Sequence, residues 1–122
     1  MKKVVLNKCF GGFGLSPKAY EFLGMPWDGY GFAYENRRDD PKLVECVEVL
    51  GEEANGMYAE LVVEEYDDYN YTHRIGEYDG WESLVLSPIV HTSKIESMTS
   101  DEIIEYLITL GIQIVFDEEE LI

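Results

Sequence analysis

A glycine-rich stretch between an apolar strand and a short helix most constrains how this chain can fold. The run Val4-Val5-Leu6 is typical of a central, buried strand, and it leads into residues 8–17, where three glycines fall within four positions. Glycine adopts left-handed and tightly turned backbone conformations that other residues resist. Ser16 followed by Pro17 is a helix start, with a hydroxyl cap and a proline at the first helical position. The stretch therefore predicts a strand, a glycine turn and a capped helix in succession.

Length and composition indicate one folded domain. The 122 residues are enough for a single hydrophobic core, and a hydrophobic content of 46% with 13% aromatic residues favours a globule over a disordered acidic chain. No apolar run approaches the length of a membrane span, and the initial Met-Lys-Lys is not followed by a long apolar segment. We therefore expect a cytoplasmic protein that does not enter a membrane.

Hydrophobic spacing switches along the chain between a helical period and a strand period, which predicts an α+β fold. Each helix opens at a capping residue (Ser16, Asp40 or Thr99), and the helices are expected at 17–23, 41–51 and 100–110. Strands are expected at 2–9, 31–35, 58–65, 69–75, 81–86 and 112–116, with an acidic tail at 117–120. The third to fifth of these are separated by turn residues and should form an antiparallel meander. The expected fold is a single domain with a mainly antiparallel sheet and about three helices.

A strong negative charge limits the possible partners. Twenty-five acidic residues against nine lysines and arginines give a formal net charge of −16. This charge disfavours direct binding to nucleic acid and to anionic membranes, and it attracts basic proteins. The simpler interpretation is that the charge only keeps the protein soluble. The acids nominated for contact with a partner cluster around two predicted turns: Glu64, Glu65, Asp67, Asp68, Glu77 and Asp79.

The glycine turn is also a candidate site for an anionic ligand such as a nucleotide. Backbone N–H groups at a helix start can bind an anion, and basic residues occur nearby in the sequence. The nominated ligand-binding residues are Lys8, Gly11, Gly12, Gly14, Ser16, Arg37 and Arg38. The simpler interpretation is that the glycines only turn the chain. A group of aromatic residues either lines a pocket and stacks a base or covers an edge of the core: Trp27, Tyr30, Phe32 and Tyr34.

Motifs of catalysis and metal binding do not stand out. Carboxylates flank His73 in the sequence, but they fall in predicted turns where Asp is simply a good turn former. Cys9 and Cys46 are predicted to be small buried hydrophobes, and neither histidine stands at ligand spacing from a cysteine. We therefore nominate no catalytic residue, no metal ligand and no cofactor.

Five blocks of the sequence stand out when they are taken together and in order. They are the opening 2–16 (Lys-Lys-Val-Val-Leu-Asn-Lys-Cys-Phe-Gly-Gly-Phe-Gly-Leu-Ser), 38–44, 50–56, 58–64 and 77–80. These blocks resemble a family of small, uncharacterised proteins encoded by phages and prophages. The resemblance implies a phage origin and an α+β fold, and the family has no established activity to carry over. It covers residues 1–86, whereas residues 87–122 look like an added or divergent end with a helix, a strand and the acidic tail.

Three functions remain open at this point. The first is a non-enzymatic inhibitor that places its acidic face on a basic surface of a host defence protein in the host cytoplasm. The second is a protein that sequesters a nucleotide or another small ligand at the glycine turn. The third is a phage structural or housekeeping factor. The sequence does not indicate an oligomeric state.

Overall fold

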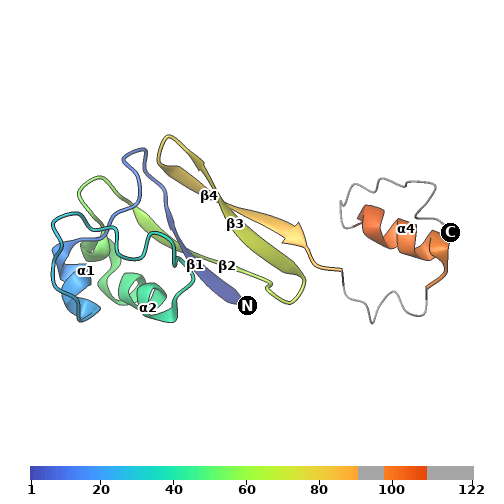
Figure 1. The fold of residues 1–122 in the computed structure, drawn as a ribbon, viewed down its shortest axis with the longest axis horizontal. Helices are drawn as coiled ribbons and strands as arrows, with labels where there is room; N and C mark the ends of the chain where they lie inside the picture. The colour runs from blue at the N-terminus through green and yellow to red at the C-terminus, as the bar shows by residue number, and fades with distance from the viewer. Residues whose placement is uncertain (91–97, 110–122) are drawn as a thin grey trace.

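The computed structural model describes residues 1–90 and 98–109. Within them the order of elements is β1 (Lys2–Asn7), α1 (Pro17–Phe22), α2 (Pro41–Leu50), a 3-10 helix η1 (Gly51–Ala54), β2 (Leu61–Tyr66), β3 (Tyr71–Tyr78), β4 (Trp81–Pro88) and α4 (Ser100–Thr109). The expected α+β fold is confirmed, with three α-helices and four antiparallel strands in this part of the chain (Figure 1). The predicted strand 112–116 and the acidic tail lie outside the described residues.

The three predicted helices begin at their predicted caps. The Ser16 hydroxyl accepts the N–H of Ala19 at 3.1 Å, and Asp40 accepts the N–H of Lys42 at 2.9 Å. Thr99 accepts the N–H of Glu102 at 3.3 Å at the start of α4. These side chains satisfy N–H groups that the first turn of a helix leaves without a partner. Local chemistry therefore sets the helix starts.

The strands form two separate pairs rather than the expected meander. β1 pairs with β2, and β3 pairs with β4, in each case antiparallel. β2 forms no ladder with β3, and hydrogen bonds to Asp67 fix the connection between the two strands. The Asp67 carboxylate accepts the N–H of Tyr69 and the side-chain amide of Asn70, and its carbonyl accepts the N–H of Tyr71. Only the second of the two expected hairpins is therefore present.

The expected strand at 31–35 is wrong. These residues form a loop and turns, and Gly29 and Gly31 have positive φ angles of 87° and 91°. The Asp28 carboxylate accepts the N–H groups of Tyr30 and Gly31, so side-chain bonds replace the ladder that a strand would need. The aromatic residues that alternate along this segment therefore belong to a loop held by hydrogen bonds to Asp28, and not to a strand.

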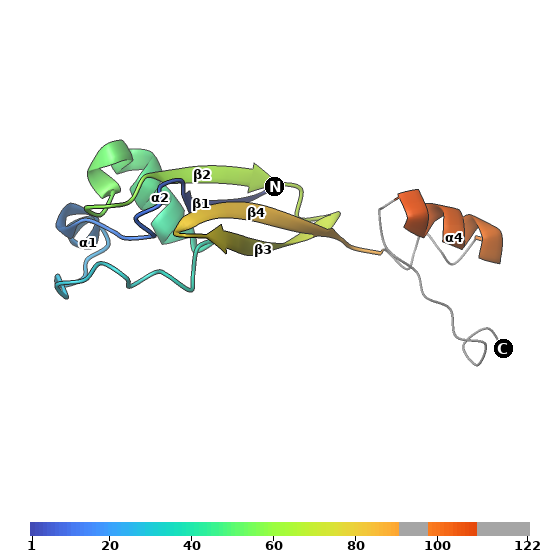
Figure 2. The ribbon, with the colours of Figure 1, turned by 90° about the horizontal axis from the view of Figure 1, so that it is seen from above.

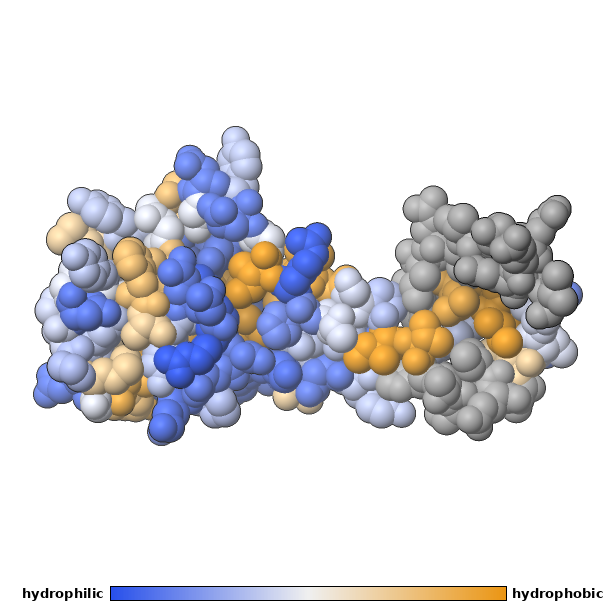
Figure 3. Space-filling view, viewed as in Figure 1, coloured by the Kyte–Doolittle hydropathy of each residue, from blue (hydrophilic) through white to orange (hydrophobic). Residues whose placement is uncertain are grey.

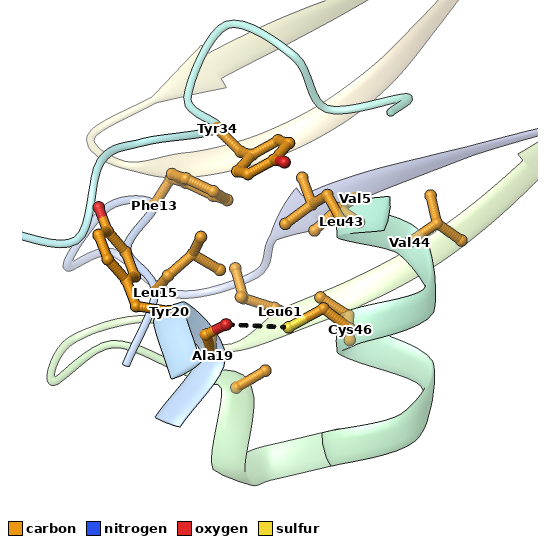
Figure 4. Packing of buried hydrophobic residues seen from close by; sticks show 12 residues of the cluster. Val5, Phe13, Leu15, Ala19, Tyr20, Tyr34, Leu43, Val44, Cys46 and Leu61 are labelled. Carbon is orange, nitrogen blue, oxygen red and sulfur yellow. Dashed lines mark hydrogen bonds between the residues drawn. The ribbon is translucent and has the colours of Figure 1, made fainter. Parts of the chain in front are cut away.

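The β1–β2 pair lies between two hydrophobic clusters. On one face Val5 and Leu61 join a core with α1 and α2, to which Tyr20, Leu43 and Cys46 contribute (Figure 4). On the other face Val4, Leu6 and Tyr66 pack against residues of the β3–β4 hairpin. Because both faces of β1 are covered, its apolar run is continuous. Figure 2 shows the hairpin lying along β1 and β2, with α4 drawn away from them.

β1 was expected to be a central strand, but it is an edge strand of a two-stranded sheet. In the described part of the chain it has one ladder partner, β2. At the opposite edge, residues 38 and 82 provide the hydrogen-bond partners of Val5 and Asn7. Groups of two other segments, the backbone and side chain of Arg38 and the side chain of Glu82, thus take the place of a second neighbouring strand.

Candidate binding surface at the glycine turn

A buried ion pair between Arg38 and Glu82 holds the hairpin against β1. The guanidinium binds the carboxylate through two hydrogen bonds of 2.5 and 2.7 Å, and both side chains are almost fully buried. Glu82 also accepts the N–H of Asn7 at 2.8 Å. The Phe13 ring lies 3.7 Å from the guanidinium carbon of Arg38. Sequence reasoning missed this pair, since its members are 44 residues apart and no local pattern links them.

A third buried polar residue, Asn7, joins the glycine stretch to the hairpin turn. Its side-chain amide donates to the carbonyls of Cys9 and Gly80, at 2.7 and 2.8 Å, and its side-chain oxygen accepts the N–H of Glu60 at 2.8 Å. Asn7 is fully buried, and each of these bonds satisfies a group that would otherwise be costly to bury. The network fixes where the glycine stretch begins.

The glycines of this stretch allow neighbouring backbones to approach closely. A Cβ on Gly11 would lie 2.2 Å from Tyr58, and a Cβ on Gly56 would lie 2.7 Å from the backbone of Gly14. The N–H of Gly56 donates to the Gly14 carbonyl at 2.8 Å. Gly12 has the one positive φ angle among the three glycines of the stretch, 90°. Close packing at Gly11 and the left-handed position at Gly12 account for these two glycines without a bound anion.

Several backbone donors of the stretch are already used inside the protein. The N–H groups of Gly12, Leu15 and Ser16 donate to the carbonyls of Cys9, Gly31 and Ala54 respectively. The Ser16 hydroxyl donates to the Glu53 carbonyl. α1 has only six residues, so its helix dipole is short as well. These contacts weigh against a cradle of free N–H groups for a phosphate.

The predicted cations do not gather at the glycine turn. Lys8 donates to the Glu82 carbonyl at 2.6 Å and lies 3.7 Å from Glu64. Arg37 lies over the Tyr34 ring and donates to the Ala33 carbonyl, while Arg38 is buried against Glu82. Glu82 thus engages both cations, Lys8 through its backbone carbonyl and Arg38 through its carboxylate. The predicted set of ligand-binding residues divides into a glycine part and a paired cationic part.

A cavity of about 540 Å³ opens beside the glycine turn. Its lining combines the backbone of the turn with aromatic and methionine side chains, and among the described residues it contains no charged side chain. The side chains that we call the aromatic surface are Trp27, Tyr30, Phe32, Met57 and Tyr58. All five are exposed, Met57 to 87% and Tyr30 to 76%. Tyr34, the fourth member of the predicted aromatic group, belongs instead to the core (Figure 4).

The loop that carries much of this surface is fixed by Asp28 and Tyr20. The Tyr20 hydroxyl donates to Asp28 at 2.7 Å and accepts the N–H of Ala33 at 3.0 Å. Hydrogen bonds from the N–H groups of Gly31 and Tyr30 lower the pKa of the Asp28 carboxyl, and burial raises the pKa of the Tyr20 hydroxyl. The Trp27 ring stands edge-on to Tyr20, with ring centroids 5.0 Å apart. The exposed aromatic residues are therefore presented by an ordered loop.

A smaller apolar group continues from the turn onto the hairpin. The rings of Phe10 and Trp81 lie 5.1 Å apart, and with Tyr78 they line a second hollow of about 560 Å³ that includes Glu77. A Cβ on Gly80 would lie 2.6 Å from the Phe10 carbonyl, so the hairpin turn presses against the glycine stretch. We call Phe10, Tyr78 and Trp81 the hairpin group.

A polar cleft of about 580 Å³ lies between the hairpin and the segment before α2. Arg38 and Glu82 form part of its wall, together with Arg74 and further carboxylates: Glu35, Asp39, Glu77. The carboxylates outnumber the arginines, and Arg38 is already paired. An anionic ligand is therefore disfavoured in this cleft as well.

The acids nominated for partner contact fall into two groups at opposite ends of β3. Glu64, Glu65, Asp67 and Asp68 lie at the end of β2 and in the following turn, and Glu77 and Asp79 lie at the hairpin turn. The eight residues of β3 separate the groups by roughly 25 Å, at about 3.3 Å per residue. Figure 3 shows hydrophilic side chains over much of one face of the molecule, with hydrophobic ones over the β3–β4 hairpin.

Internal contacts engage some of these acids. Asp68 pairs with the N-terminal amino group at 3.0 Å, and a hydrogen bond from that group lowers the pKa of Asp68. Glu77 accepts the N–H of Gly80. Glu65 and Asp79 are exposed and form no ion pair within the described part of the chain. These two acids are the most available of the six for a partner.

Other candidate chemistry has structural explanations. Cys46 is buried, its thiol donates to the Ala19 carbonyl, and burial raises the pKa of that thiol to about 11 (Figure 4). Cys9 is half-buried and free. His73 shares a hydrogen bond of 2.7 Å with the Tyr66 hydroxyl.

Among residues 1–90 and 98–109, no three histidine, cysteine or acidic side chains stand together as metal ligands. In the same residues no helix is long and apolar enough to cross a membrane.

Comparison with known proteins finds no relative, so the interpretation of this surface rests on its geometry. No protein family model, curated protein or solved structure matches the chain. The resemblance to phage proteins is thus a prediction that no match tests. Sequence reasoning nominated Trp27, Tyr30 and Phe32 for a pocket but missed Met57 and Tyr58. A signal was present in the sequence, because Met57 and Tyr58 directly follow the Asn55-Gly56 pair, which is typical of a turn and therefore of the surface. Both side chains are indeed exposed.

Proposed function

We propose that this protein is a non-enzymatic inhibitor, made by a phage, that occupies a basic surface of a host defence protein in the host cytoplasm. The observation that carries the proposal is the charge left over after internal pairing. Within residues 1–90 and 98–109, five lysine or arginine side chains form ion pairs with the protein's own acids. The chain has 25 acidic residues, so most acids remain without a cation and the exterior is strongly negative.

A negative exterior of this kind favours binding to a basic protein. Clustered like charges raise the rate of encounter with an oppositely charged surface, and they repel nucleic acid that would compete for it. Glu65 and Asp79 contribute at the two ends of β3, where they are exposed. A partner that normally binds nucleic acid offers the basic groove that such an inhibitor would block.

The test is capture of a partner from host lysate at low and high salt, followed by an assay of the captured protein's own activity. Binding should weaken steeply with salt, because exposed charges are screened over about 10 Å at 0.1 M ionic strength. The double reversal Glu65→Lys with Asp79→Lys should slow association more than Glu45→Lys with Glu52→Lys, which changes the net charge equally from α2 and η1. A partner retained unchanged at high salt, or one whose activity is unaffected, contradicts the proposal.

A second candidate is sequestration of a nucleotide or similar ligand at the glycine turn. The cavity of about 540 Å³ favours it, because Gly11, Gly12, Gly14 and Ser16 line it beside aromatic rings that can stack a base. The internal contacts of these cations argue against it, because Lys8 and Arg38 pair with acids and Arg37 lies over the Tyr34 ring. A melting screen against mono-, di- and cyclic nucleotides decides, since a ligand that binds only the folded state raises the melting temperature. If a ligand is found, Tyr30→Ala should abolish that rise.

A further inference from the structure

We propose that the aromatic surface at the glycine turn is the docking site for one segment of the partner protein, a segment with a large apolar side chain flanked by lysines or arginines. The inference rests on the proposed function and names the surface through which the inhibitor contacts its partner. The apolar side chain enters the cavity between Tyr30 and Met57, and the basic residues lie over the acids at its margin.

The first support is the unusual exposure of the side chains. Met57, Tyr30 and Tyr58 are 87%, 76% and 69% exposed, and they lie around one cavity. Single exposed hydrophobic residues are ordinary, but a contiguous group of them marks an interaction surface. Aromatic residues and methionine are also the types that are enriched in the buried centres of protein interfaces. The composition of this surface is that of an interface rather than of a solvated loop.

The second support is the rigidity of the cavity. Its floor is backbone, in which Gly14 and Gly56 are joined by a hydrogen bond of 2.8 Å and Gly11 packs directly on Tyr58. Its rim is held by Asp28, which binds two backbone N–H groups and the Tyr20 hydroxyl. A surface that is ordered before binding loses little conformational entropy when a partner arrives. The volume of about 540 Å³ accommodates a large side chain and its neighbours.

The third support is charge complementarity, which identifies the flanking residues of the occupant. No lysine, arginine or histidine among the described residues lines the cavity or the hollow beside the hairpin group. Acids follow or precede several lining residues in the sequence: Asp28, Glu60, Asp79 and, in the lining of the hollow itself, Glu77. Lys18, which follows Pro17 of the cavity lining, pairs with Glu53 at 2.7 Å. Lys8, a nearby cation, is already engaged by Glu82 and Glu64. An anionic ligand would meet repulsion here, whereas a cationic segment would not.

The experiment titrates the full chain with three labelled peptides of equal length. The first alternates pairs of lysines with leucine and phenylalanine, the second has serine in place of the apolar residues, and the third has glutamate in place of lysine. Binding is measured by fluorescence polarisation and by the amide shifts of the ¹⁵N-labelled protein. The variants are Tyr30→Ala with Met57→Ala, and the matched control is Val49→Ala, which truncates an exposed apolar side chain on α2.

We expect the first peptide alone to bind well and to shift the amides of Gly11, Gly12, Gly14 and Gly56. The double variant should weaken this binding about tenfold or more, as loss of an interface hot spot does, and the control should leave it unchanged. Unchanged melting temperatures establish that each variant is folded. Equal binding of the serine peptide, shifts confined to residues 64–68, or no binding at about 1 mM peptide overturns the docking site.

These outcomes separate the docking site from the proposed function. If the lysine peptides bind but the aromatic variants have no effect, the acidic surface still binds cations and only the docking site is wrong. If salt-sensitive capture of a partner fails while the first peptide binds at the cavity, the inhibitor proposal is wrong. Concentration-dependent self-association that Tyr30→Ala with Met57→Ala abolishes would assign the surface to a second copy and contradict the docking proposal.

Discussion

The β1–β2 body and the β3–β4 hairpin are held in place in different ways. The body packs α1 and α2 against one face of its sheet through a cluster in which Leu43, Cys46 and Ala54 are fully buried. The described hairpin residues are mostly half-buried or exposed, and the hairpin is attached through Glu82, Asn7 and a smaller apolar cluster. Apolar packing spreads stability over many contacts, whereas buried hydrogen bonds concentrate it in a few. A single change should therefore displace the hairpin but only weaken the body.

The largest expected effect is the loss of the buried carboxylate at the hairpin. Glu82→Ala leaves Arg38 buried without its counter-charge and the N–H of Asn7 without its acceptor, and we expect a loss of about 3–5 kcal/mol in the free energy of unfolding. Chemical denaturation measures it, and amide exchange should rise first in β3 and β4.

A double variant controls for that result. Glu82→Leu with Arg38→Met removes both charges and keeps the volume, so it should be clearly more stable than Glu82→Ala. Equal stability of the two would mean that the pair does not hold the hairpin, and the comparison between body and hairpin would fail.

A core truncation in the body should have the next largest effect. Leu43 is fully buried between α2 and the sheet, and Leu43→Ala should lower the free energy of unfolding by about 3 kcal/mol through lost burial and a residual cavity. Here amide exchange should rise in β1, β2 and α2 together. Exchange that rises only in the hairpin would contradict the separation of the two regions.

The glycine turn, which packs against Gly80 of the hairpin, should show a smaller, position-specific effect. Gly12 has a φ angle of 90°, so Gly12→Val should cost about 1–2 kcal/mol or more in stability. Gly14 has no positive φ angle, and a Cβ there meets only an ordinary contact of 3.8 Å, so Gly14→Val should cost less. Thermal melting of both variants checks the order, and equal melting temperatures would show that the left-handed position is not demanding.

The smallest expected effect is a loosening of the aromatic loop in acid. Hydrogen bonds from Gly31 and Tyr30 lower the pKa of Asp28 in the folded protein below its unfolded value of about 3.9. The carboxylate therefore stabilises the loop above that pH, and the stabilisation is lost as pH falls through the lowered folded pKa. The amide shift of Gly31 should titrate with a midpoint below 3.9, as a marker of Asp28 alone. A midpoint at or above that value, or an unchanged titration in Asp28→Asn, would contradict this assignment.

The sequence by itself determined the features that depend on neighbouring residues. The caps Ser16, Asp40 and Thr99 begin helices because each side chain satisfies an N–H two or three residues ahead. The turn residues Tyr78-Asp79-Gly80 predicted the β3–β4 hairpin, with positive φ angles at Asp79 and Gly80. The candidate site was found in part, since the glycine stretch and the aromatic residues Trp27, Tyr30 and Phe32 do line one cavity.

Only the tertiary structure decided which distant segments meet. β1 and β2 pair across more than 50 residues, and Arg38 meets Glu82 across 44, so no local period encodes either contact. Arg38 was expected at a ligand and is instead buried, because the unfilled edge of β1 and the Glu82 carboxylate together satisfy its guanidinium. Likewise, burial of Tyr34 and exposure of Tyr30 follow from the loop that Asp28 anchors. Side chains of one type in one segment differ in environment because packing, not composition, determines which of them reaches the core.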